Sequence, residues 1–379
     1  MDFEFSEDQV SLRDAVARWV DKAYGFEQRR AIVKAGGYSA ESWTAMAELG
    51  LLGLAIPEEH GGMGFGAVEA MVVMEELGRG MVLEPYAAVA LVAAPMLVHS
   101  AAPSKDLWLQ NIADGSALVV LAHQERGARH RLQQVQTTAE QDPSGNWRLN
   151  GRKSLVPAGQ HAGAFIVPAR VSGAVDDPSG IALFLVTPGV GVSLQGYPTQ
   201  DGACAAEVTL DGATGIQMYA AGEAYAVLEA AIDRGLAAQA AEGVGLMDKL
   251  TAITVDYMNT RKQFNVTLAS FQALRHRIAD VKMQLELARS MSYYASLKLG
   301  EPAPQRRRAI SQAKVQIGNS ARFVGQQCVQ LHGGIAVTDE YVASHYFKRL
   351  TMLEMEYGDT LHHLGEVSAR MQDTAGVFA

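Results

Sequence analysis

A single carboxylate, Glu242, lies in the otherwise small and apolar stretch AAQAAEGVGLM at residues 237–247, with no Lys or Arg within five positions. On a helix, neighbours such as Ala238, Ala241 and Leu246 would remove water from this carboxylate and favour its protonated form. A carboxylate in such surroundings is suited to act as a general base near pH 7. The alternative is a structural residue that forms hydrogen bonds within a helical bundle, and the stretch fits both roles.

The composition excludes several classes of function. The chain has 379 residues and a formal charge of -9, from 41 acidic and 32 basic side chains, without a basic cluster typical of nucleic-acid binding. Its only cysteines, Cys204 and Cys328, have no metal-type spacing. The opening residues, MDFEFSEDQ, lack the pattern of a secretory signal, and apolar stretches such as AAVALVAAPMLV from Ala87 are too short to span a bilayer. We therefore expect a reduced, cytoplasmic protein with no nucleic-acid partner, no metal site and no membrane insertion.

The hydrophobic period changes twice along the chain. It is helical from Ser6, which can cap the first helix, to about Gly115. It is strand-like from Ala117 to about Gly215, where short β-branched runs alternate with turn residues, and it is helical again from Glu223. This order predicts an α+β, mainly α chain with a helical domain at 1–115, a β domain at 116–218 and a second helical domain at 219–379.

Several local strings, taken together and in this order, resemble the acyl-CoA dehydrogenase family over nearly the whole chain. The strings are FSEDQVSLRDAVARWV, LGLLGLAIPEEHGG, MEELGRG, LNGRKSLVPAGQHAGAFIVPAR, TRKQFNVTLASFQ and QCVQLHGGIAVTDEY. The resemblance implies an N-terminal helical domain, a middle β-barrel and a C-terminal four-helix bundle. It also implies FAD as the cofactor and an acyl-CoA thioester as the substrate.

In such a reaction a carboxylate removes a proton from Cα, and hydride leaves Cβ for flavin N5. The family resemblance implies that the electrons then pass to an electron-transfer flavoprotein. It further implies an oligomer, as a dimer or a dimer of dimers, because elements of one subunit serve the cofactor of its neighbour.

The string TRKQF supplies the first cofactor candidates. Arg261, Gln263 and Phe264 match the family string that reaches the FAD of a neighbouring subunit, and a guanidinium suits a pyrophosphate because it can bind two oxygens at once. The alternative is an exposed helix end with an ordinary salt bridge. Asn265 stands where the family usually has Gly.

A second group of cofactor candidates follows from QLHGG and YGDT. Gln330, Gly333 and Gly334 match the stretch where the backbone closely approaches the adenosine diphosphate moiety, which glycine permits because it lacks Cβ. Thr360 falls where the family places a hydroxyl near the cofactor, although a Thr after Gly-Asp also fits a helix cap.

The strand region departs from the family pattern at its cofactor positions. Gln124 is the second residue of the string HQERGARH at residues 123–130, which lacks the family's phosphate-binding serine. Val156 is followed by Pro157 and an alanine where the family has Ile-Thr-Asn beside the flavin, and proline has no backbone N–H to donate. Arg129 and Arg131 either replace the lost phosphate contacts or are solvated charges.

The catalytic base is not at either of its usual family positions. Alignment of Thr360 with the family's Glu-Gly-Thr string places Gly358 at the usual acid, and the version on the long helix falls near Gly235. Glu242 is about two helical turns after Gly235 and projects from nearly the same face, so it is our first candidate base. Asp359, next to the vacant position, is the second.

Two other functions remain open. The chain is either a non-catalytic or half-site partner that completes the FAD site of a second dehydrogenase chain, or a related flavin oxidase or monooxygenase on the same fold. The glycines at the usual acid positions permit a wide, branched, dicarboxylic or ring-containing acyl group without choosing among them.

Overall fold

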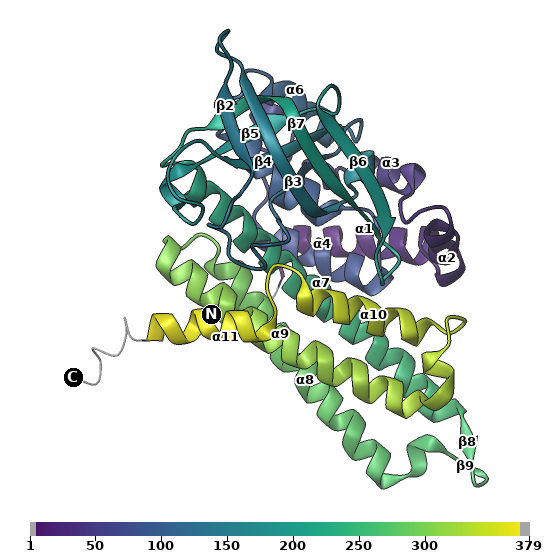
Figure 1. Ribbon diagram of the computed structural model, residues 1–379. Coiled ribbons are helices and arrows are strands. Elements are labelled where there is room, and N and C mark those ends of the chain that lie inside the picture. Colours follow the sequence, from purple (N-terminus) through teal and green to yellow (C-terminus); the bar gives the residue numbers. More distant parts are fainter. Residues whose placement is uncertain (1–4, 372–379) are drawn as a thin grey trace. The chain divides into compact units, whose positions relative to one another are not determined.

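The computed structural model describes residues 5–371 and divides into two compact units. The first unit contains residues 1–30, 67–82 and 236–379, and the second contains residues 31–66 and 83–235. Both units are therefore assembled from segments that are far apart in the sequence (Figure 1). The division into domains at 1–115, 116–218 and 219–379 stays a prediction, although the observed changes from helix to strand and back lie close to residues 115 and 218.

The chain begins and ends with helices. The N-terminal helices are α1 (Glu7–Ala23), α2 (Phe26–Lys34), α3 (Ala40–Glu48), α4 (Ala67–Gly80), a π-helix (Ala87–Ala93), α5 (Ala94–Val98) and α6 (Lys105–Ala113). The C-terminal helices are α7 (Ala224–Thr260), α8 (Gln272–Lys298), α9 (Ala303–His332), α10 (Val342–Met355) and α11 (Thr360–Met371). Ser6 caps α1 as expected, since its side chain and that of Gln9 form a reciprocal capping box.

A seven-stranded sheet forms the middle of the chain, in the second unit (Figure 1). Its strands are β1 (Val119–Leu121), β2 (Thr138–Gln141), β3 (Trp147–Pro157), β4 (Ala164–Arg170), β5 (Ile181–Val186), β6 (Val192–Pro198) and β7 (Cys204–Tyr219). Pairing runs from β4 through β2, β3, β7 and β5 back to β4, so the sheet closes on itself as a barrel. The middle sheet expected from the short β-branched runs is thus confirmed.

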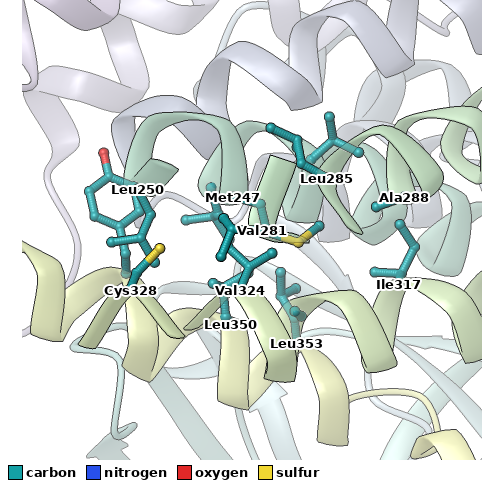
Figure 2. Packing of buried hydrophobic residues seen from close by; sticks show 14 of the residues in the cluster. Met247, Leu250, Val281, Leu285, Ala288, Ile317, Val324, Cys328, Leu350 and Leu353 are labelled. Carbon is teal, nitrogen blue, oxygen red and sulfur yellow. The ribbon is translucent and has the colours of Figure 1, made fainter. Parts of the chain in front are cut away.

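The hydrophobic core of the first unit lies among α7, α8, α9 and α10 (Figure 2). Met247 of α7, Leu285 of α8, Val324 of α9 and Leu350 of α10 all have relative exposures of 1% or less. Because these helices are long and each carries apolar residues at helical spacing, their apolar faces can be buried together as a four-helix bundle. The two-stranded hairpin of β8 (Lys262–Gln263) and β9 (Val266–Thr267) follows α7.

Within residues 5–371, no helix combines the length and apolarity needed to cross a membrane.

Candidate functional site

Glu242 is held by an arginine that is remote in the sequence. Arg349 Nε donates to Glu242 Oε1 at 2.6 Å, and Arg349 Nη2 donates to Oε2 at 2.8 Å. Glu242 is 8% exposed, so this is a largely buried, two-point ion pair between α7 and α10. Glu242 is buried as its sequence neighbours indicate, but its cation comes from another helix, which the local stretch does not show. The structural alternative, a Glu that forms hydrogen bonds within the bundle, matches these contacts.

The ion pair is part of a chain of polar contacts across three helices. Arg349 Nη1 also donates to Glu356 Oε1 at 3.0 Å. Glu356 accepts a second hydrogen bond from the amide of Gln239 in α7, and the Gln239 carbonyl oxygen accepts one from Lys314 in α9 at 3.1 Å. These groups are satisfied by one another within an apolar bundle, which is the condition under which buried polar groups are tolerated.

Asp359, the second candidate base, lies in the short segment between α10 and α11 and has a structural partner. Its Oδ1 accepts the backbone N–H of His362 at 2.8 Å, so Asp359 caps the first turn of α11. The preceding Gly358 has φ +108°, and a Cβ there would collide with the rings of His362 and His363. The position of the family's usual acid is therefore closed to any side chain in this conformation.

Thr360 is buried against α9. Its Oγ1 atom has no hydrogen-bond partner among residues 5–371, and Gly318 lies opposite it where a Cβ would overlap the hydroxyl. This hydroxyl is an unsatisfied polar group inside the bundle rather than one presented at the surface.

The candidates in TRKQF form an exposed projection at the end of α7. Arg261 and Gln263 are exposed, and Phe264 at the tip of the β8–β9 hairpin is 86% exposed. Phe264 and Asn265 both have positive φ, which the tight two-residue turn requires. The ring of Phe264 lies edge-on to that of Phe271, with centroids 6.4 Å apart, but most of it stays in water. Because burial of a large aromatic ring is favourable, this projection suits insertion into another molecule.

Gln330, Gly333 and Gly334 lie at the same end of the bundle. His332, beside them, packs on Tyr257 in the last turn of α7, with ring centroids 4.6 Å apart. Gln330 and both glycines are exposed, and no atom of the described chain would lie within 4 Å of a Cβ on either glycine. The structure thus places these two groups of candidates at the same end of the bundle. The backbone at Gly333 and Gly334 is open to solvent there.

The barrel candidates have different surroundings. Gln124 is partly buried, and its carbonyl oxygen accepts the N–H of Ser154. The next residue, Glu125, forms a buried ion pair with Lys153 at 2.7 Å. Burial opposes ionisation of Glu125, but the charge and hydrogen bond of Lys153, together with hydrogen bonds from Thr137 and Gln136, lower the pKa of this carboxyl below its usual value. Both carboxylate oxygens of Glu125 are thus engaged by groups of the second unit.

The stretch after Ser154 offers few hydrogen-bond donors. A bulge between β3 and β7 gives Leu155 a φ of +52°, and its N–H donates to the hydroxyl of Tyr197 at 3.1 Å. Val156 is 1% exposed, Pro157 has no N–H, and the N–H of Ala158 donates to Cys204 at 2.9 Å. A flavin edge needs such donors, and the stretch from Leu155 to Ala158 does not fit this need. The bundle end, with its exposed guanidinium, amides and glycines, fits the diphosphate half.

Three functional residues were missed in the sequence. Arg349 lies 107 positions after Glu242, and Tyr197 lies 42 positions after Leu155, so neither pairing leaves a local pattern. Lys314 left a usable one: it occupies a core position of α9, between the buried Ile310 and Ile317 at helical spacing, where a lysine needs buried acceptors. No group of three or more His, Cys, Asp or Glu side chains in the described ranges is arranged to hold a metal ion.

Two family models match most of the chain. Residues 6–116 match "Acyl-CoA dehydrogenase, N-terminal domain", and residues 222–372 match "Acyl-CoA dehydrogenase, C-terminal domain". Acyl-CoA dehydrogenase FadE12 of Mycobacterium tuberculosis is 30% identical over 353 residues, which cover 89% of this chain and 88% of FadE12.

Solved structures give the same result for the fold. The ChsE4-ChsE5 complex from Mycobacterium tuberculosis has a chain with a TM-score of 0.87 and 25% identity, covering 98% of this chain and 99% of that one. Butyryl-CoA dehydrogenase from Megasphaera elsdenii has a TM-score of 0.90 at 22% identity, covering 98% of this chain and all of that one. The expected architecture of N-terminal helices, a middle sheet and C-terminal helices is confirmed.

Proposed function

Because the chain belongs to the acyl-CoA dehydrogenase family, whose members are FAD-dependent oxidoreductases, we propose that it works in the α,β-dehydrogenation of an acyl-CoA thioester. The acceptor in this proposal is an electron-transfer flavoprotein, and the active form is an oligomer. The observation that supports it most is the exposed bundle end, where Tyr257, about one turn before Arg261, packs on His332, two residues after Gln330.

At this end the chain would hold the diphosphate half of an FAD bound to a neighbouring chain. Arg261 would pair with the pyrophosphate through two N–H groups, and Gln263 and Gln330 would donate amide hydrogens to its oxygens. Gly333 and Gly334 would let the backbone approach closely. Phe264 would cover an apolar part of the neighbour. When bound, FAD supplies the acceptor for the hydride that leaves Cβ.

The base is proposed as Glu242, with Asp359 as the second candidate. Each has a structural partner that it would have to give up: Glu242 would leave Arg349, and Asp359 would leave the first turn of α11. A carboxylate with both oxygens engaged by a guanidinium is a weak proton acceptor until that contact opens.

A second candidate function is that of a partner subunit, which completes the cofactor site of another dehydrogenase chain and has no complete site of its own. The donor-poor stretch from Leu155 to Ala158 favours it, because the barrel of this chain then has no flavin to hold. ChsE4-ChsE5, with which this chain shares its fold, is by its name a complex of two different chains.

One experiment separates the two candidates. The chain is purified alone with excess FAD, and the absorbance near the flavin bands is recorded before and after anaerobic addition of acyl-CoA thioesters of short, long, branched and ring-containing acyl groups. An autonomous enzyme is yellow and bleaches with at least one thioester. A colourless chain that gains bound, reducible flavin only when co-purified with a second dehydrogenase chain from its source is a partner subunit. A chain that remains colourless and inert in both preparations contradicts the proposed function.

A further inference from the structure

A buried lysine contacts the segment between α10 and α11, residues 356–359. Lys314 of α9 is 4% exposed, and its Nζ donates to the carbonyl oxygens of Leu353 and Glu356, the latter at 2.8 Å. Leu353 lies in the last turn of α10 and Glu356 follows its end, so these carbonyls are among those that a helix end leaves without partners. Lys314 therefore caps α10 from a different helix.

The third hydrogen bond of Lys314 extends this hold to the Glu356 side chain. Its acceptor, the Gln239 carbonyl oxygen, belongs to an amide that in turn donates to the Glu356 carboxylate. All three ammonium hydrogens are thus used, and two of the three contacts fix the backbone directly. The charged groups that face Lys314 are Glu356 after the end of α10, Glu354 and Arg349 of α10, Glu242 of α7 and His363 of α11.

The segment held in this way carries the residues of interest. Gly358 is the family's acid position, Asp359 is the second candidate base, and Thr360 is the candidate cofactor hydroxyl. Tyr357 and Gly358 both have positive φ, at +56° and +108°. Such backbone conformations persist only where the surroundings enforce them. This holds most for Tyr357, because its β-carbon makes a positive φ unfavourable.

We infer that Lys314 is a positioning residue that fixes the α10–α11 segment, and with it Asp359 and Thr360, through its contacts with the end of α10. The role of this segment in catalysis rests on the proposed function. The positioning of the segment by Lys314 is a property of the isolated chain, so positioning and catalysis can be tested separately.

Hydrogen exchange of the isolated chain measures how firmly Lys314 fixes the segment. The backbone N–H groups of Glu356, Thr360, His362 and His363 are hydrogen-bonded within or beside the segment and report on it. In Lys314→Met, which keeps the length of the side chain but removes the donors, their protection factors should fall by about tenfold to a hundredfold. Protection of the α8 core around Leu285 should stay within about threefold of the wild type.

Three further variants make the result specific. Lys314→Arg keeps the charge and several donors, so it should recover part of the protection. Gln239→Met removes one of the three acceptors and should reduce protection at the same four amides by less than Lys314→Met does; it also decides the matter if Lys314→Met fails to fold. Lys282→Met removes an exposed lysine of α8 and should change nothing at the segment. Equal loss of protection over the whole bundle, or no loss at the four amides, overturns the inference.

The catalytic part is tested in whichever flavin-loaded assembly the purification yields. Lys314→Met should lower kcat by tenfold or more while flavin content and the KM for acyl-CoA stay within about threefold, since a displaced segment misplaces reacting groups more than it weakens binding. A merely structural lysine would lower flavin content and kcat in proportion to the folded fraction. If no assembly turns over acyl-CoA, the proposed function fails, and the exchange result still decides whether Lys314 holds the segment.

Discussion

Gly245 of α7 lies directly against the carbonyl oxygen of Glu75 in α4, so that a Cβ on Gly245 would overlap this oxygen. Gly78 of α4 makes the reciprocal contact with the backbone of Glu242. The two helices thus cross backbone to backbone at Gly78 and Gly245. This close crossing explains why the residue three positions after Glu242 is a glycine.

This crossing predicts a large difference between two glycines of one helix turn. Gly245→Ala should lower the stability by about 3 kcal/mol, because the new methyl group meets backbone that cannot move without separating α4 from α7. Gly243→Ala places its Cβ 3.3 Å from the Ile317 side chain and gains helix propensity, so its effect should stay within about 1 kcal/mol. Urea unfolding followed by circular dichroism measures both. Equal midpoints for the two variants would show that the crossing has enough slack to admit a methyl group.

Much of the fold could be predicted from the sequence because it leaves local patterns. The capping box at Ser6, the β-branched runs that became β4 and β5, and the apolar period of α9 are all short-range features. The compact units could not be predicted in this way, since α4 joins the first unit from a distance and no local pattern records that contact.

In the candidate site, too, residues in contiguous strings could be predicted and contacts between distant residues could not. Exposure of Arg261, Phe264 and Gln330 agrees with a role outside their own subunit, and the strings that contain them are contiguous. The partner of Glu242 could not be predicted, because its cation, Arg349, comes from a helix that begins about a hundred residues later. Whether a buried carboxylate is a base or half of an ion pair depends on that distant residue.

The Glu242–Arg349 pair predicts strong coupling in a double-mutant cycle. Glu242→Gln should cost about 2 kcal/mol, because Arg349 loses a charged two-point partner in a largely buried place. Arg349→Met should cost more, since it removes a guanidinium that pairs with both Glu242 and Glu356. The double variant should be more stable than the sum of the two losses predicts, by about 2 kcal/mol. Additive losses would show that the pair contributes nothing net.

The same Glu242→Gln variant tests the base. If Glu242 removes the Cα proton, flavin reduction by acyl-CoA should fall by about two orders of magnitude or more at unchanged flavin content. The comparison is made at a temperature where circular dichroism shows the variant fully folded, so that lost stability does not imitate lost chemistry. Reduction at the wild-type rate removes Glu242 as the base and leaves Asp359 or a second chain.

The burial of His363 predicts that the protein loses stability in acid. Burial lowers the pKa of His363 to about 3, and its Nε2 donates to the carbonyl oxygen of Tyr357 while Nδ1 accepts the hydroxyl of Ser311 at 3.2 Å. The unfolded chain binds a proton at this histidine first, near pH 6.5, so stability is complete above that pH and falls as the pH drops from 6.5 towards 3.

Between pH 7.0 and 5.5 this histidine should account for about 1 kcal/mol of lost stability. His363→Gln, which cannot be protonated, should therefore show a flatter dependence on pH than the wild type, whatever its stability at pH 7.0. His276→Gln, which changes an exposed histidine of α8, should keep the wild-type slope. The free energy of unfolding in urea is measured at both pH values, and identical slopes for all three proteins would contradict the assignment.

Substitution of Arg261 should weaken FAD binding in the assembled protein without changing the stability of the isolated chain. The Arg261 side chain is exposed in the isolated chain, so Arg261→Ala should leave the unfolding midpoint unchanged. In the flavin-loaded assembly, loss of a two-point contact with the pyrophosphate should weaken FAD binding by about tenfold to a hundredfold. The measurement is the flavin retained after dialysis against a series of free FAD concentrations. Arg275→Ala removes an equally exposed arginine of α8 as the matched control and should retain wild-type flavin. If both variants keep their flavin, the bundle end does not hold the diphosphate, and the in-trans part of the proposed function is wrong even where the chain remains an active dehydrogenase.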